Sequence, residues 1–298
     1  MREKFIEIKF KRKSLELIRA CQEVIDRVHE EIAGPLSVRQ VFYGLVGSGF
    51  FISNQQNYDK TINAIRDGRL TGLLDWSDVE DRNREALYLP TYRNPKHFLQ
   101  TSAHWYLSDH WAGQDCKIEL WAEKATLTGI LEPLALGHQV TLLAMRGFPS
   151  LDALYKARDR FASSDAGSKI IMLISDADPA GYDMERDIRE RLCADLKVED
   201  VEIRRLGLTV EQAKQLNAEK NYVKEKTDTR AKEFIRLTGG TDCYELEGVS
   251  PAIVTRWADD AIKAEINSEI LIATLEAEEA NREALLSHAR HYRGPHRT

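Results

Sequence analysis

Carboxylates follow two of the hydrophobic segments that lie beyond residue 116. Glu123 comes directly after residues 117–122, and Asp176 and Asp178 come directly after residues 169–175. Residues i and i+2 at the end of an extended strand point the same way, so the two aspartates can reach one point in space. Converging carboxylates repel one another unless a cation joins them, and oxygen-only ligands favour a hard ion such as Mg²⁺. The pattern therefore indicates a divalent-metal site.

Two of these carboxylates also have a purely structural explanation. Asp178 precedes Pro179, and an N-cap followed by a proline at the first helical position is a common way to begin a helix. Glu123 is followed by Lys124, which is compatible with an ordinary surface ion pair. No such explanation covers Asp176. The metal interpretation is favoured because a strand-terminal Glu and a D-x-D sequence occur together within one alternating pattern of strands and helices.

A second group that could do chemistry lies near the N-terminus. Arg39 and Tyr43 are four residues apart, so on a helix they are neighbours on one face. A phenol with a pKa of about 10 is a poor nucleophile at neutral pH, and an adjacent guanidinium favours the phenolate and can hold a phosphate oxygen. The alternative is an amphipathic tyrosine at a helix surface beside a solvated arginine.

The elements that must position Tyr43 are three short helices. Apolar residues recur at helical spacing over residues 14–32, 38–46 and about 57–66. Gly34-Pro35 ends the first of these segments, and a Gly-Ser-Gly sequence closes the second. Three short helices with tight turns resemble a winged-helix or helix-turn-helix module. A plain helical bundle is the alternative.

The elements that must position the carboxylates alternate between strands and helices. We expect strands at residues 117–122, 139–145, 169–175 and 201–206, and helices at 126–136, 150–161 and 179–196. This alternation predicts a parallel sheet covered by helices on both faces, with ligands at the carboxyl ends of the strands. Residues 85–113 lack a clear period and are expected to form a connector. Beyond the sheet, further helices are expected at residues 210–216, 229–237 and 251–286, before a loose basic tail at 288–298.

Composition places the chain among globular proteins. Of its 298 residues, 43% are hydrophobic and 30% are charged, and no apolar run approaches the ~18 residues that span a bilayer. We expect no membrane association and a cytoplasmic location. The net charge of −6 argues against indiscriminate coating of nucleic acid. Residues 1–100 hold 16 Lys and Arg against 14 Asp and Glu, whereas the remainder holds 26 against 34. The N-terminal third is therefore mildly basic and the rest of the chain is acidic.

Three motifs together resemble a known module. Glu123 after a hydrophobic strand, Arg-Gly-Phe-Pro at 146–149 and Asp-Ala-Asp-Pro-Ala-Gly at 176–181 look like a Toprim domain, the metal-binding module of topoisomerases, primases and some nucleases. The form with D-x-D-P-x-G and a G-F-P turn is similar to the A subunit of topoisomerase VI and its meiotic break-making relatives. That resemblance implies an upstream winged-helix domain bearing a nucleophilic tyrosine, which falls on Tyr43, with Arg39 beside it.

The resemblance covers residues 35–84 and 117–250 and leads to an expected α/β fold in two domains. We expect a helical, winged-helix-like DNA-binding domain over residues 1–84 and a connector over 85–113. A Toprim-type parallel α/β sheet domain is expected over 114–250, and a C-terminal helical segment with a basic tail over 251–298.

The activity implied by the resemblance is Mg²⁺-dependent DNA cleavage and rejoining through a phosphotyrosine, as in a type IIB topoisomerase A subunit, with Mn²⁺ as the alternative ion. Tyr43 and Arg39 would be catalytic, and Glu123, Asp176 and Asp178 would hold the metal. The residues expected to contact DNA phosphates are Lys60, Arg66, Arg69, Lys124 and Arg146.

Expected partners are double-stranded DNA and a second copy of the chain, in a nucleoid-associated setting. In the family that this chain resembles, the tyrosine of one subunit works beside the metal site of the other. The sequence contains no G-x-x-x-x-G-K-[ST] loop. ATP-driven strand passage would therefore need a separate ATPase subunit.

Two other functions remain open from the sequence. The first is a Toprim nuclease of a plasmid or phage defence system, which hydrolyses DNA with metal and water and does not use Tyr43. The second is a DNA-binding or assembly protein that keeps the fold without chemistry. Glu245 and Glu247 resemble an acidic motif late in the family, but a helix start explains them equally well.

Overall fold

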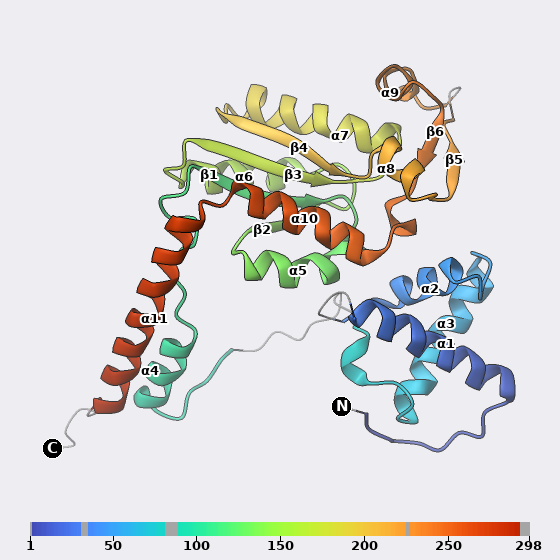
Figure 1. Ribbon diagram of the computed structural model, residues 1–298, viewed down its shortest axis with the longest axis horizontal. Helices are drawn as coiled ribbons and strands as arrows, with labels where there is room; N and C mark the ends of the chain where they lie inside the picture. The colour runs from blue at the N-terminus through green and yellow to red at the C-terminus, as the bar shows by residue number, and fades with distance from the viewer. Residues whose placement is uncertain (1, 31–34, 81–88, 225–226, 293–298) are drawn as a thin grey trace.

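The computed structural model describes residues 2–30, 35–80, 89–224 and 227–292. Figure 1 shows a group of N-terminal helices, a sheet with helices on both faces, and a two-helix arm that projects from the sheet. We call these the helical module (residues 2–80), the sheet module (residues 108–266) and the arm (residues 95–107 and 268–291). The predicted α/β class with a parallel sheet is confirmed.

The helical module is built from the three predicted helices. They are α1 (Arg12–His29), α2 (Val38–Gly47) and α3 (Gln55–Leu70), followed by a 3₁₀ turn at Trp76–Asp78. Their apolar faces enclose a separate core, because side chains three and four apart on each helix meet in the middle. Its largest fully buried members are Ile25, Leu36, Leu45 and Leu74.

The sheet has four parallel strands in the order β2-β1-β3-β4. They are β1 (Cys116–Ala122), β2 (Thr141–Ala144), β3 (Ser168–Ile174) and β4 (Val201–Gly207). The chain moves from β1 outward to β2 and then crosses back to β3 on the other side of β1. The winding direction therefore reverses between β1 and β3. In open α/β sheets a ligand crevice forms at such a reversal, outside the carboxyl ends of the two strands.

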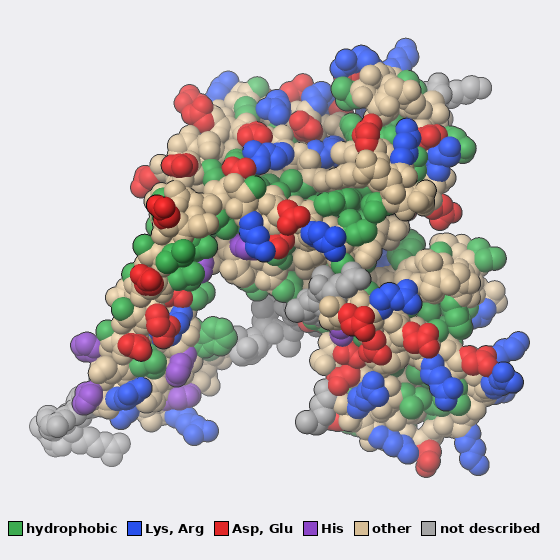
Figure 2. Space-filling view, viewed as in Figure 1, with side chains coloured by type: hydrophobic (Ala, Val, Ile, Leu, Met, Phe, Trp, Pro, Cys, Tyr) green, Lys and Arg blue, Asp and Glu red, His purple; other side chains and the backbone are tan. Residues whose placement is uncertain are grey.

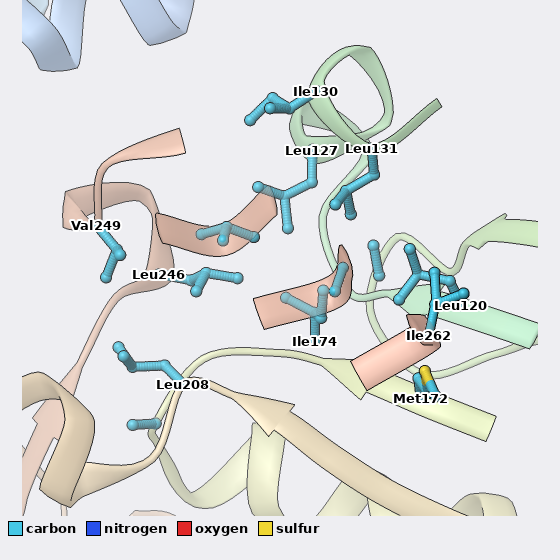
Figure 3. Packing of buried hydrophobic residues seen from close by; sticks show 14 of the residues in the cluster. Leu120, Leu127, Ile130, Leu131, Met172, Ile174, Leu208, Leu246, Val249 and Ile262 are labelled. Atoms are coloured by element: carbon cyan, nitrogen blue, oxygen red, sulfur yellow. The ribbon is translucent and has the colours of Figure 1, made fainter. Parts of the chain in front are cut away.

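Helices cover both faces of the sheet, as the sequence predicts. α5 (Thr128–Gly137) and α10 (Pro251–Glu265) lie on one face, and α6 (Leu151–Ala162) and α7 (Pro179–Arg189) lie on the other (Figure 1). Side chains alternate along the buried central strands, so Leu120 and Met172 face the α5–α10 side. Figure 3 shows these side chains meeting those of the helices and of a loop that carries Leu246 and Val249.

Small elements complete the sheet module. They are a 3₁₀ turn at Ala125–Leu127, a π-helical turn at Glu190–Asp195, α8 (Val210–Gln215), β5 (Lys220–Tyr222), α9 (Ala231–Thr238), β6 (Asp242–Tyr244) and a 3₁₀ turn at Leu246–Gly248. The antiparallel pair of β5 and β6 was not predicted, because three-residue strands carry too little alternation to be recognised.

The arm differs from the sequence-based expectation in two places, a helix that was not predicted and a single predicted helix that was wrong. The connector contains a helix, α4 (Pro95–His104), capped by Asn94, whose exposed apolar residues hide its period. The single helix expected over 251–286 is two helices, because the chain turns at Ile266–Asn267 and Asn267 caps α11 (Ser268–His291). The expected tail begins inside α11, and its residues 293–298, like residues 85–88 of the connector, lie outside the described residues.

α10 also changes how the C-terminal boundary is drawn. We placed the end of the sheet domain at residue 250, but Val254, Ala258 and Ile262 belong to the same buried cluster as β1 and β3. α10 is therefore a structural part of the sheet module. Among the described residues, no helix is long and apolar enough to cross a lipid bilayer.

A buried ion pair fixes the middle of β1. Glu119 is fully buried and accepts two hydrogen bonds from Arg160 of α6, at 2.7 and 2.8 Å, and one from the Trp121 indole at 2.8 Å. Because removal of one partner leaves a buried charge without compensation, we expect Arg160→Ala to lower the free energy of unfolding by about 3 kcal/mol. Urea denaturation would measure this loss.

The matched control is Arg158→Ala on the same helix. Its guanidinium is 42% exposed and pairs with a half-exposed Asp159 at 3.8 Å, so its loss should cost less than about 0.5 kcal/mol. Equal denaturation midpoints for the two variants would contradict the role given to the Glu119–Arg160 pair.

Candidate functional site

Glu123 and Asp176 meet at the crevice between β1 and β3. Each lies just beyond the end of its strand, and the Glu123 amide continues the sheet by donating to the Ile174 carbonyl at 2.8 Å. The Glu123 carboxylate then accepts a hydrogen bond from the Asp176 amide at 2.9 Å. The side chain of Glu123, which the sequence predicts to be a metal ligand, thus joins the ends of β1 and β3.

Asp176 is held by contacts on both of its carboxylate oxygens. It is only 6% exposed; Oδ1 accepts from the Leu246 amide at 2.8 Å, and Oδ2 lies 2.9 Å from the Lys124 ammonium. The loop after β3 is further fixed by a pair of backbone hydrogen bonds between Ala177 and Tyr244. The segment that follows Tyr244 therefore lies directly against the D-x-D loop.

Asp178 is the N-cap of α7, as its position before Pro179 predicts. Its Oδ1 accepts from the Gly181 amide at 2.7 Å. Position 181 must be glycine, because a Cβ there would overlap the Asp176 carbonyl oxygen. This cap does not exclude a role for Asp178 as a metal ligand. A carboxylate has two oxygens, and Oδ2 can make a further contact while Oδ1 caps the helix.

The charges of these carboxylates are coupled. Burial and the neighbouring Asp176 carboxylate raise the pKa of Glu123 to about 7, and burial with the Asp176 charge raises the pKa of Asp178. Burial would lower the pKa of Lys124, but Asp176 outweighs it and the pKa is raised. Both carboxyl pKa values are raised first by burial and then by the neighbouring carboxylate, so a cation placed beside these carboxylates would favour their ionised forms.

The helix that carries Tyr43 begins with a well-formed cap and contacts the sheet module. Ser37 and Gln40 exchange hydrogen bonds in a capping box at the start of α2. The Gln40 amide also donates to the Thr126 carbonyl at 3.2 Å, and the Arg39 guanidinium lies 3.7 Å from Glu247. The side chains of this helix therefore face the carboxylate region of the same chain.

Arg39 is set between two partners. Burial would lower its pKa, but the Glu247 carboxylate and the Tyr43 hydroxyl outweigh this effect and the pKa of Arg39 is raised. Tyr43 is half-buried, and its ring packs 5.5 Å from that of Phe42. The predicted neighbourhood of Arg39 and Tyr43 on one helix face is thus present in the structure.

Two adjoining hollows lie between the modules. The first, which we call the charged pocket, has a volume of about 330 Å³ and is lined by Arg39, Glu123, Lys124, Arg146 and Glu247, with three small neighbours between them. The second, which we call the tyrosine cleft, has about 270 Å³, shares Arg39 and Glu247 with the first, and is mostly apolar. Tyr43 lines the tyrosine cleft and is not among the residues that line the charged pocket.

The three predicted metal ligands reach different surroundings. Glu123 faces the charged pocket, Asp176 is buried behind Lys124, and Asp178 lines a third hollow of about 630 Å³ together with Arg230. Over the ranges that the structure describes, no three His, Cys, Asp or Glu side chains are arranged to hold a metal ion. The donor chemistry nevertheless fits a hard divalent cation, since all three supply oxygen and their charges repel one another.

The three basic residues predicted on α3 lie apart from the charged pocket. Lys60 donates to the Asn57 side chain at 3.0 Å, and Arg66, whose side chain is 59% exposed, pairs with Asp67 at 2.7 Å. Arg69 is used inside the helical module, where it stacks 4.6 Å over the Trp76 ring and donates to the Trp76 and Val79 carbonyls. It therefore has a structural role, and we do not retain it as a DNA contact.

Sequence reasoning missed two residues of the site. The Glu247 carboxylate lies 3.7 Å from the Arg39 guanidinium and 3.6 Å from the Lys124 ammonium, and the sequence alone assigns its acidic motif no role. Arg205 of β4 is partly buried beneath the D-x-D loop, where it donates to the Ser175 hydroxyl at 2.7 Å and to the Gly181 carbonyl. An arginine inside a strand gives no sequence signal of such a contact.

Comparisons with protein-family models, with curated proteins and with solved structures gave no match to this chain. The case for a function rests on the residues of the site and on their arrangement.

Proposed function

We propose that this chain cleaves DNA by transesterification, as a winged-helix-like module joined to a Toprim-type sheet module of the topoisomerase VI A-subunit kind. The observation that carries this proposal is the charged pocket. Arg39, one turn from Tyr43, shares that pocket with Glu123, Lys124 and Arg146. A pocket that combines cations from both modules with a strand-end carboxylate is suited to a phosphodiester.

The roles of the side chains follow from their charges. Arg39 and Arg146 hold non-bridging phosphate oxygens, and Lys124 neutralises charge beside the carboxylates. The Tyr43 oxygen of a second copy attacks the phosphorus, as the resemblance implies. The phosphorus–oxygen bond to the sugar breaks, the phenolic proton passes to solvent, and the sugar oxygen takes up a proton. Rejoining is the reverse of this exchange.

Glu123, Asp176 and Asp178 are the residues that would hold Mg²⁺ or Mn²⁺. The ion, when bound, would stabilise negative charge on the phosphate. Lys124 already contacts Asp176 at 2.9 Å, so it competes with a metal ion for that carboxylate. Arg205 supports the same loop from below and keeps its two aspartates in place.

A second candidate is metal-dependent hydrolysis of DNA by water, as in a defence nuclease. One observation favours it: Tyr43 lines the tyrosine cleft, whereas Glu123, Lys124 and Arg146 line the charged pocket. Water reaches the charged pocket without any movement of α2. In the transesterification proposal, Tyr43 instead reaches a phosphate held by a second copy of the chain, as the resemblance implies.

The experiment that tests DNA cleavage is incubation of the purified full-length chain with supercoiled plasmid over a titration of Mg²⁺ or Mn²⁺. We expect nicked, linear or relaxed plasmid that appears with the metal and disappears with EDTA. Binding of the plasmid without any such product, at every metal concentration and in the presence of candidate partner subunits, would favour a non-catalytic DNA-binding or assembly protein and contradict both cleavage proposals.

A further inference from the structure

The arm exposes apolar side chains that the described residues of this chain cover only in part; the ring of Phe98, for example, meets that of Tyr92 at 4.9 Å. Of the ten residues of α4, only Ala103 is buried, whereas Phe98 is 46% and Leu99 36% exposed. The chain after α4 continues with Trp105, 78% exposed, and Leu107, 60% exposed. A ten-residue helix is only marginally stable without tertiary packing. α11 packs against one side of α4 and the other side stays exposed, so a further surface could cover it.

The facing helix α11 is also poorly covered. Only Glu278 and Ala289 are buried among its 24 residues, and Ile272 and Leu275 are 56% and 43% exposed. Residues three apart lie on one side of a helix, so these two form an apolar strip. Figure 1 shows that the α4–α11 pair projects away from the sheet, with no other described helix or strand along its length.

The base of the arm is fixed, so this surface is presented in a defined orientation. Glu278 accepts hydrogen bonds from the Ser108 amide at 2.8 Å, from the His110 ring at 3.1 Å and from Arg282. Arg282 also donates to the Tyr106 carbonyl at 3.1 Å. These contacts tie α11 to the segment that leads from α4 into the sheet.

Charge is segregated along the arm. The half of α11 nearer the sheet, residues 268–283, contains five glutamates and a single basic residue, Arg282. The distal part, made of α4 and residues 284–291, contains no Asp or Glu. Its basic residues and histidines are Lys96, His97, His104, His288, Arg290 and His291. Figure 2 shows acidic side chains along the arm and histidines toward its free end.

We propose that the arm pairs with the arm of a second copy of this chain in an antiparallel arrangement. A two-fold axis across the arm sets the acidic half of each copy against the basic half of the other, and it brings the exposed apolar residues of both copies together. A DNA duplex does not fit this surface equally well, because the glutamates of the inner half repel phosphates. Four helices then replace two and supply the missing cover for α4.

The test is the mass of the full-length chain in solution, measured by light scattering during size-exclusion chromatography. We expect the wild type to have twice the mass of the 34.0 kDa chain, and Phe98→Glu with Leu275→Glu to have the monomer mass. The matched control is Leu136→Glu, which changes a leucine on α5 that is 70% exposed and should leave the dimer intact.

A second pair of variants, in which charges of the arm are reversed, tests the same dimer if Phe98→Glu with Leu275→Glu fails to fold. Lys96→Glu with Arg290→Glu makes the whole arm acidic, and Glu276→Lys with Glu283→Lys removes the acidic half; all four residues are exposed. Each variant alone should be monomeric, and an equimolar mixture should restore the dimer mass.

A monomeric wild type, a dimer that persists in both charge variants, or a mixture that stays monomeric would overturn the proposal. The proposal would also be overturned if the wild type were monomeric and the variant Phe98→Glu with Leu275→Glu lost DNA binding. The arm would then bind DNA and not a second copy of the chain. A monomeric wild type would also remove the second copy that transesterification uses. The plasmid assay measures cleavage separately, since none of the substituted residues lines the charged pocket or the tyrosine cleft.

Discussion

Asp176→Asn lowers the rate of DNA cleavage by about 10³-fold in our account, while the fold is kept. Asparagine has the same shape, so its side-chain oxygen still accepts from the Leu246 amide, which now bonds to Asp176 at 2.8 Å. The substitution removes the negative charge that faces Lys124 and that would bind the metal ion. Loss of one electrostatic contribution of this kind typically costs a factor of about 10² to 10³ in rate.

In this variant the cleavage rate should fall, whereas the affinity for DNA should not fall. Removal of a negative charge beside the charged pocket reduces the repulsion of DNA phosphates, so the affinity for a duplex should stay equal or rise slightly. Cleavage rate from a plasmid assay and affinity from fluorescence anisotropy measure the two effects. The matched control is Asp152→Asn, whose carboxylate is 72% exposed and pairs with Lys156 on α6; cleavage at the wild-type rate is expected there.

Retention of wild-type cleavage by Asp176→Asn would contradict the placement of the reaction at the end of β3. A loss of cleavage accompanied by a large fall in the unfolding midpoint would instead mean that Asp176 acts as a structural residue. In that case Glu123→Gln should be examined, since the Glu123 side chain can still accept from the Asp176 amide after this change.

Tyr43→Phe is expected to abolish cleavage, with a loss of about 10⁴-fold or more, because the attacking oxygen is removed. Stability should change little, since the ring and its packing against Phe42 are retained. The measurement is plasmid cleavage with Mg²⁺ under single-turnover conditions. The matched control is Tyr58→Phe, which removes a second tyrosine hydroxyl near the same arginine, and whose ring also packs against Phe42, at 5.4 Å.

The pair of variants separates the two cleavage mechanisms. Transesterification requires that Tyr43→Phe be inactive and that Tyr58→Phe remain active. Hydrolysis by water requires that both tyrosine variants remain active and that Asp176→Asn be inactive. Equal loss in both tyrosine variants would point to a disturbed α2–α3 contact and would contradict a chemical role for Tyr43.

The part of the structure that could be predicted follows from strong periodic signals. The expected strands at residues 117–122 and 169–175 are short, mostly apolar segments, and together with the alternating helical segments that follow them they predict a parallel sheet. Because carboxyl ends of such strands share one edge, Glu123 and Asp176 were expected to meet, and a hydrogen bond of 2.9 Å joins them. Local sequence was sufficient for this contact.

The part that could not be predicted depends on long-range contacts. Glu247 enters the site because Leu246 is buried in the same hydrophobic cluster as Leu127 (Figure 3) and its amide donates to Asp176. Seventy residues separate Leu246 from Asp176, and no local pattern encodes their contact. α4 was missed for a related reason, since a helix without a buried face in this chain shows no apolar period.

The central claim is that Tyr43 forms a covalent bond to DNA, and mass spectrometry of the trapped protein tests it most directly. Full-length chain would be incubated with labelled duplex DNA and Mg²⁺, denatured rapidly, and digested with nuclease and protease. We predict a peptide containing Tyr43 whose mass is increased by one nucleotide. Cleaved DNA without any nucleotide-bearing peptide, or a nucleotide attached to another residue, would contradict the account.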